Sequence, residues 1–212
     1  MRLQHARVEL ELGVLSDRDG PALLLLHGLG GSSADWGELP AAWPGRVFGL
    51  DFSGHGGSQP MRGGVYQPEL LAGDADTALA EIGPAALAGA GVGAYVALLL
   101  AGGRAELVPA ALLLPGRGLA GGGPQPNWDR SPVEAIEQAP STPLPPGCDA
   151  RCSALENDPR PPAYAAHFAR AARRVLRFED GTPRPPWWAA AGGDAVGGTI
   201  GDALHALAIA AR

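Results

Sequence analysis

The chain has 212 residues, of which 46% are hydrophobic, and it carries a formal net charge of −6. This length predicts one globular domain with a buried core, and the acidic balance argues against nucleic acid or an anionic membrane surface as a partner. All 16 basic residues are arginine, which excludes Schiff-base chemistry and any other mechanism that needs a lysine.

The first half of the chain alternates apolar runs with helical patterns. Residues 7–12 alternate polar and apolar side chains, which is typical of an antiparallel strand near the edge of a sheet. The runs "PALLLLHG" and "RVFGLD" predict strands covered on both faces, with a short helix capped by serines between them. A helix is expected over residues 67–83, followed by a strand at "AALAGA".

The second half continues the alternation around one irregular segment. A helix over residues 92–103 leads to a fourth strand at "VPAALLLPG". Residues 119–162 are rich in Gly, Pro and polar residues, which predicts a lid or insertion with one short helix at "SPVEAIEQA". We then expect a helix at "PAYAAHFARAARR", a fifth strand at "VLRFED", a sixth at "PPWWAAAGG" and a closing helix at "TIGDALHALAIAA". Residues 1–212 therefore form a single α/β domain, a mostly parallel sheet with helices on both faces.

Two cysteines, Cys148 and Cys152, stand four residues apart in the irregular segment, in "CDARC". No further ligands at zinc-site spacing accompany them, so the sequence predicts two loop thiols and no metal or other cofactor. Either thiol would serve as a nucleophile only if it folded over a site beside a base. The N-terminus lacks the apolar run of a signal peptide and no run reaches membrane-spanning length, which makes the cytoplasm the expected location.

The turn "GAGVGA", residues 89–94, fits two glycine motifs. As G-x-G-x-x-A it matches the dinucleotide-binding fingerprint, and as G-x-G-x-G it matches the nucleophile elbow G-x-S-x-G with Gly91 at the serine position. The fingerprint normally follows the first strand of a sheet and precedes an acidic residue about twenty positions on. Neither condition holds here, although Arg117 could meet a 2′-phosphate, and dinucleotide binding is kept as an alternative.

The segments around this turn resemble the α/β-hydrolase superfamily. The stretches "LLLLHGLGGSSADW" and "VFGLDFSGHGGS" and then the glycine turn stand in the order and spacing of that family, over most of residues 20–115. His27 and Gly28 resemble its H-G oxyanion loop. The resemblance implies an α/β-hydrolase fold and a catalytic triad in the chain order nucleophile, acid, histidine.

Carried onto this chain, the triad is incomplete. The nucleophile position falls on Gly91, which has no side chain, so that neither a serine nor an aspartate nucleophile is present there. The acid position falls after the fifth strand, where Glu179 and Asp180 stand, and Asp180 is the candidate. The histidine position falls in "GGDAVGG", which contains no histidine, while His167 and His205 belong to helical patterns.

The resemblance also implies that the backbone of the oxyanion hole survives. Its two N–H donors map to Val92, at the start of a helix, and to Leu29. A missing side chain at residue 91 predicts open space above these donors for a carbonyl-bearing or anionic small molecule. The candidate ligand-binding residues are Gly28, Leu29, Gly30, Trp36 and Val92.

Two function hypotheses follow from the resemblance. The first is a catalytically degenerate member that binds such a ligand, or a protein partner, at the elbow. The second is an active ester or amide hydrolase with relocated groups, for which His27, Ser53 and His55 are the candidates. Their loops are expected at the carboxyl edge of the sheet, where ligands bind in open α/β folds.

Overall fold

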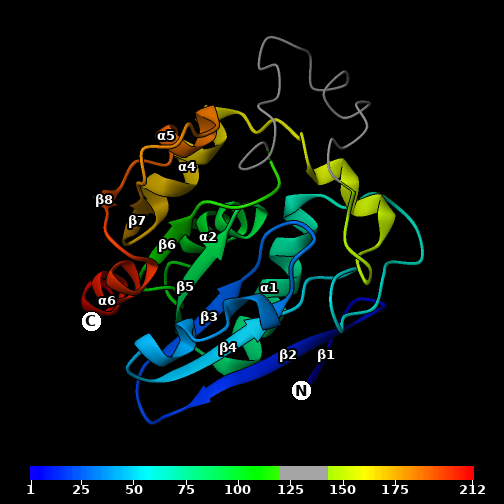
Figure 1. The fold of residues 1–212 in the computed structure, drawn as a ribbon, viewed down its shortest axis with the longest axis horizontal. Helices are drawn as coiled ribbons and strands as arrows, with labels where there is room; N and C mark the ends of the chain where they lie inside the picture. The colour runs from blue at the N-terminus through cyan, green and yellow to red at the C-terminus, as the bar shows by residue number, and fades with distance from the viewer. Residues whose placement is uncertain (120–142) are drawn as a thin grey trace.

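The computed structural model describes residues 1–119 and 143–212. The expected helix at "SPVEAIEQA" and the first part of the expected lid lie outside these residues. The strands are β1 (Arg2–His5), β2 (Val8–Asp17), β3 (Ala22–Leu26), β4 (Arg46–Leu50), β5 (Ala85–Ala90), β6 (Ala111–Leu114), β7 (Val175–Phe178) and β8 (Asp194–Val196). The described part of the chain forms one sheet in the order β1-β2-β4-β3-β5-β6-β7-β8 (Figure 1).

Most of this sheet is parallel, as the apolar runs predict. Only the pairs β1–β2 and β2–β4 are antiparallel, and the other neighbours run parallel. Successive residues of β3 belong to opposite core layers, Leu24 and Leu26 to one and Leu23 and Leu25 to the other. A strand buried on both faces has no polar face, which is why its sequence shows no alternation.

Helices cover both faces of the sheet. The helices are α1 (Pro68–Ile82), α2 (Val92–Gly103), α4 (Pro162–Ala171), α5 (Pro186–Ala190) and α6 (Ile200–Ala210), with 3₁₀ turns η1 (Ser33–Trp36), η2 (Leu39–Ala42) and η3 (Ala150–Leu155). The core layer that contains α1, α2, α4 and α5 lies on one face, and η1, η2 and α6 pack on the other. None of the helices in the described residues is long and apolar enough to cross a membrane.

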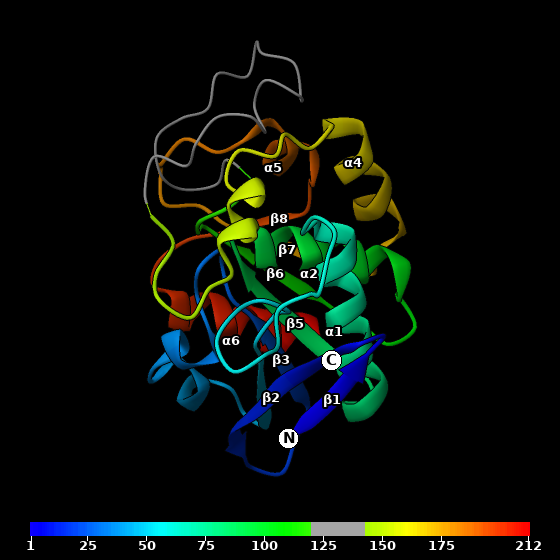
Figure 2. The same cartoon turned by 90° about the vertical axis from the view of Figure 1, so that its right-hand side faces the viewer.

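The N-terminal strand differs from the expected one. A hairpin replaces the single strand, because the chain turns at Ala6, which adopts a positive φ of 50°. Figure 2 shows this hairpin at the edge of the sheet, next to α1. Tight hairpin turns are usually signalled by glycine or asparagine, and neither residue occurs at this turn.

The expected sixth strand at "PPWWAAAGG" is wrong. This segment contains α5, which starts at Pro186 and buries both Trp187 and Trp188. Proline fits the first turn of a helix because its missing N–H has no intrahelical partner there. The last strand is instead β8, inside "GGDAVGG"; it has three largely exposed residues at the sheet edge and therefore no hydrophobic pattern.

Candidate functional site

The turn between β5 and α2 is an elbow with Gly91 at its tip. Gly91 has φ 55° and ψ −118°, a conformation that costs a non-glycine residue on the order of 1–3 kcal/mol. Its amide donates a hydrogen bond of 3.1 Å to the carbonyl of Leu114 at the end of β6. The strand, sharp turn and helix are those implied by the hydrolase resemblance.

Close packing explains the other two glycines of the motif. A Cβ atom at Gly89 would collide with the backbone of Gly93, and one at Gly93 would collide with the carbonyl oxygens of Leu26 and His27. The glycines therefore let α2 rest directly on β3 and β5. Packing alone explains the glycine pattern, so no bound pyrophosphate is required to explain it. The turn also follows the fifth strand in chain order and not the first, so the dinucleotide alternative has no support in the structure.

The amides of Leu29 and Val92 converge on a single oxygen atom, as the donors of an oxyanion hole do. That oxygen is the main-chain carbonyl of Arg117, at 3.0 Å from the Leu29 nitrogen and 3.1 Å from the Val92 nitrogen. The chain itself thus fills the position at which a substrate oxyanion would bind.

The expectation of open space above Gly91 is wrong. A Cβ atom at residue 91 would collide with the Arg117 carbonyl oxygen and would lie only 2.6 Å from the Arg117 nitrogen and from the carbonyl carbon of Gly116. After β6 the chain turns back over the elbow instead of leaving it free. We call residues 115–119 the elbow cover.

An ion pair holds the elbow cover in place. The Arg117 Nε atom donates to Oε2 of the buried Glu156 at 2.7 Å, and its guanidinium also donates to the Pro143 carbonyl at 3.2 Å. The cover is further joined to η3 by a hydrogen bond of 2.7 Å from the Leu119 amide to the Leu155 carbonyl. A buried charge pair of this kind is costly to break, because one charge is then left without its partner.

The candidate acid has a local role in the structure. Asp180 accepts hydrogen bonds from the amide and hydroxyl of Thr182, at 3.0 and 2.6 Å, and pairs with Arg184 at 2.5 Å. These hydrogen bonds from Thr182 lower the pKa of the Asp180 carboxyl. The carboxylate therefore closes an exposed turn after β7, and none of the chain's five histidines, all of which lie in the described ranges, is its partner.

The loop in which the family resemblance places the triad histidine contains no histidine. The loop after β8 consists of Gly197, Gly198 and Thr199, and Thr199 caps α6. His205 lies exposed on α6 and His167 lies exposed on α4. Among the described residues, neither the candidate acid Asp180 nor either of these helical histidines takes a triad place beside Gly91.

Comparison with known proteins identifies the fold. The sequence profile of the alpha/beta hydrolase family matches residues 23–208. The chain belongs to this family. No curated protein matches the sequence of this alpha/beta hydrolase family member.

Solved structures of the same fold are distant in sequence. A hypothetical protein from Pseudomonas aeruginosa PAO1 is 19% identical, with a TM-score of 0.71 over 99% of this chain and 96% of that one. An N-acyl homoserine lactone degrading enzyme is 15% identical, with a TM-score of 0.67 over 93% and 91%. An E-2-(acetamidomethylene)succinate hydrolase is 16% identical, with a TM-score of 0.65 over 93% and 89%. At these identities the likeness shows the alpha/beta hydrolase fold and nothing finer.

The H-G loop residue His27 is structural in this family member. Its Nδ1–H donates to the Gly28 carbonyl at 2.8 Å, and its Nε2 accepts from the Phe52 amide at 3.1 Å. Burial, with the neighbouring His55, lowers the pKa of His27 to about 3. The imidazole is therefore neutral with both nitrogens engaged, and it ties the loop after β3 to the loop after β4.

Trp36 does not join the other predicted ligand-binding residues. It is buried in the core layer on the α6 side of the sheet, whereas Leu29 and Val92 belong to the opposite layer. Trp36, in the short η1 turn, therefore packs on the face of the sheet opposite to the elbow helix α2. Gly28 lies beside the cover, since a Cβ there would lie 3.3 Å from the Arg117 backbone, whereas a Cβ at Gly30 would meet Pro145 at 2.8 Å.

Ser53 lies in a polar group that the sequence does not reveal. Its amide donates to Oδ2 of the buried Asp74 at 2.9 Å, and Oδ1 of that carboxylate pairs with Nδ1 of His5 at 2.6 Å. A surface pocket of about 370 Å³ is lined by these three residues among others. The Ser53 hydroxyl has no hydrogen-bond partner within the described residues, so nothing there activates it as a nucleophile.

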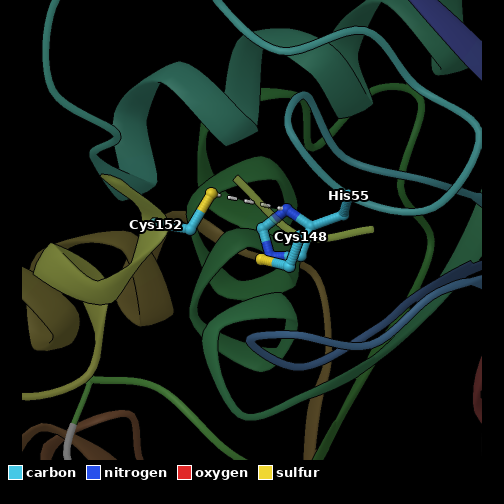
Figure 3. A group of neighbouring side chains, drawn as sticks. All are labelled: His55, Cys148 and Cys152. Atoms are coloured by element: carbon cyan, nitrogen blue, oxygen red, sulfur yellow. Dashed lines mark hydrogen bonds between the residues drawn. The ribbon is translucent and has the colours of Figure 1, made fainter. Parts of the chain in front are cut away.

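His55 lies beside both cysteines, although it precedes Cys152 by 97 residues (Figure 3). Its Nδ1 atom is 3.9 Å from the Cys152 sulfur, and the three ligand-type atoms lie within 4.8 Å of one another. Hydrogen bonding to Cys152 and His55 lowers the pKa of Cys148 to about 5, while Cys148 and burial raise the pKa of Cys152. The prediction of two loop thiols without further neighbours is therefore wrong.

Proposed function

We propose that this protein is a catalytically degenerate member of the alpha/beta hydrolase family, in which the elbow binds an oxygen acceptor and does not cleave a substrate. The single observation that carries the proposal is the Arg117 carbonyl, which occupies both oxyanion amides above a glycine at the nucleophile position. Acyl transfer needs a nucleophile, a base and a vacant oxyanion site, and the proposal is supported by the lack of all three at Gly91 among residues 1–119 and 143–212.

The proposed ligand class follows from the carbonyl oxygen to which the two amides already donate. Leu29 and Val92 present two N–H donors to one carbonyl oxygen. A ligand carbonyl or carboxylate would replace the Arg117 oxygen without loss of either hydrogen bond, and the amino end of α2 favours negative charge there. Such a ligand binds only when the elbow cover has moved, so its affinity is reduced by the small fraction of molecules in that state.

The first test is an esterase assay with short-chain p-nitrophenyl esters. We expect the wild-type protein to show no turnover above buffer, and we expect Gly91→Ser to stay inactive, because a new hydroxyl would lack both a base and a vacant oxyanion site. Gly91→Ala is the matched control, since it carries the same steric change without a hydroxyl.

Two results would overturn the proposal. Turnover that appears only in Gly91→Ser would mean that an acid and a base act at the elbow after all. Turnover by the wild-type protein would mean that the nucleophile lies elsewhere. Ser53→Ala and Cys148→Ser would then identify which side chain carries it.

A further inference from the structure

The cluster of His55, Cys148 and Cys152 has no part in the proposed function. Cys152 and His55 are fully buried, and Cys148 is half-buried. The contacts that these groups make elsewhere are weak: the Cys152 sulfur is 3.9 Å from the Gly54 carbonyl, and the Cys148 sulfur is 3.7 Å from the Asp149 carbonyl. Two thiols that make only weak contacts elsewhere are thus gathered beside one imidazole.

The two ring nitrogens of His55 differ in their surroundings. Its Nε2 atom is buried and has no hydrogen-bond partner among the residues that the structure describes. Its Nδ1 atom is 3.2 Å from the Ser53 carbonyl and 3.9 Å from the Cys152 sulfur. A neutral imidazole has one N–H and one lone pair, so a cation at Nδ1 requires the tautomer with the proton on Nε2, and the Ser53 carbonyl then loses its donor.

The spacing of the three groups suits a tetrahedral metal site. Zinc bonds of about 2.3 Å to sulfur and about 2.0 Å to nitrogen place neighbouring ligand atoms roughly 3.5–3.8 Å apart. The Cys152 sulfur and the His55 Nδ1 atom are already 3.9 Å apart, and no ligand atom is more than 4.8 Å from another. Small rotations of the side chains would close the remaining distance.

The two loops that carry the cluster are fixed to each other. The Asp149 amide donates to the Gly54 carbonyl at 2.8 Å, and the Asp149 carboxylate accepts from the Tyr66 hydroxyl and from the Arg151 amide, both at 3.0 Å. Asp149 therefore binds the cysteine segment to the loop after β4 without being a member of the cluster. Supporting hydrogen bonds of this kind hold metal ligands in position.

One of the three proposed ligands, Cys148, borders a pocket. A pocket of about 210 Å³ reaches Cys148 and is lined by Gly54, Ser58, Pro60, Gly147, Cys148 and Asp149. We infer that His55, Cys148 and Cys152 form a binding site for one thiophilic divalent cation, zinc by its ligand set, with a water molecule from this pocket as the fourth ligand. Two thiolates and one imidazole select zinc over calcium or magnesium, which prefer oxygen ligands. Two thiolate charges also neutralise a divalent ion in this buried place.

The test is metal titration of the full chain, purified with a reductant and a chelator that are then removed. Cobalt(II) added to the protein should give the charge-transfer and visible bands of tetrahedral thiolate coordination, and zinc should abolish them at one ion per chain. Cys148→Ser, Cys152→Ser and His55→Asn should each weaken binding by at least about tenfold. His167→Asn and His205→Asn, at exposed positions on α4 and α6, are the matched controls and should bind as the wild type does.

Three results would overturn the inference. The first is the absence of thiolate bands. The second is cobalt binding that survives Cys152→Ser, because the metal would then sit elsewhere. The third is a non-reducing mass two hydrogen atoms lighter with no free thiol, which would show that the two cysteines pair as a disulfide. Circular dichroism of Cys148→Ser, whose half-buried position tolerates the change best, separates loss of a ligand from loss of the fold.

Discussion

The elbow follows β5, whereas the cysteine cluster joins the loop after β4 to η3, and the polar groups of the two places are in opposite states. At the elbow the two oxyanion amides are saturated by the Arg117 carbonyl, and the nucleophile position has no side chain. In the cluster three side chains with chemical capacity lie within 4.8 Å of one another, and the His55 Nε2 atom lacks a partner. The two backbone donors that the family resemblance indicates are thus occupied by the chain's own carbonyl. The reactive side chains lie in a place that the resemblance does not indicate.

The largest effect is expected from filling the elbow. Gly91→Ser should lower the free energy of unfolding by about 3 kcal/mol or more, because the positive φ costs 1–3 kcal/mol and overpacking adds 1–3 kcal/mol. Chemical denaturation measures the change, with Gly63→Ser as a control at a glycine where a new Cβ meets nothing within 4 Å. Equal stability of the two variants would show that the elbow cover is easily displaced.

A smaller loss is expected when the elbow cover is released from its ion pair. Glu156→Ala removes the buried carboxylate that pairs with the Arg117 guanidinium and should cost about 2 kcal/mol, less than the loss of a fully buried pair, because Arg117 is 22% exposed and keeps other interactions such as its hydrogen bond to the Pro143 carbonyl. The freed cover should also raise the affinity for butyrate, followed by calorimetry. Glu81→Ala, exposed on α1, is the control. Unchanged butyrate affinity would mean that the elbow cover does not block a ligand site.

The smallest effect concerns the His5–Asp74 pair, a third polar group whose members satisfy each other. The hydrogen bond to Asp74 raises the pKa of His5 above its ordinary value of 6.5. The pair's contribution to stability is then fully present below pH 6.5 and is lost as pH rises through the higher pKa of the folded state. His5→Gln should therefore lower the free energy of unfolding more at pH 6 than at pH 9, by no more than about 1 kcal/mol, since His5 is 28% exposed. A loss independent of pH would mean that His5 acts through packing alone.

The parts of the fold that the sequence predicts are those with a local physical cause. Buried parallel strands need continuous apolar runs, and Leu23 to Leu26 supplies one. The sharp turn at Gly91 needs a residue that tolerates positive φ. The alternation of such elements predicts the α/β class, and the family resemblance adds the hydrolase fold. β8 is missed because a three-residue edge strand buries little, and α5 is missed because five residues are too few to show a helical period, although the helix buries Trp187 and Trp188.

The site was less predictable because its decisive contacts are distant in sequence. Glycine at residue 91 shows that a side chain is missing, but it does not show that the Arg117 carbonyl, on another loop, takes the space. His55 and Cys152 are 97 residues apart, and only the docking of the cysteine segment on the loop after β4 brings them together. The candidate acid Asp180 had the right position after β7, but its turn satisfies it locally.

The elbow cover limits which amino-acid substitutions at residue 91 evolution can accept. A single change of Gly91 to serine would introduce a hydroxyl while clashing with the Arg117 carbonyl, so it would lower stability before it gave any activity. Retracting the cover first would leave two buried amides without an acceptor. The two changes are therefore coupled, each being unfavourable without the other. Selection acting on one change at a time would therefore disfavour both first steps toward a nucleophile at residue 91.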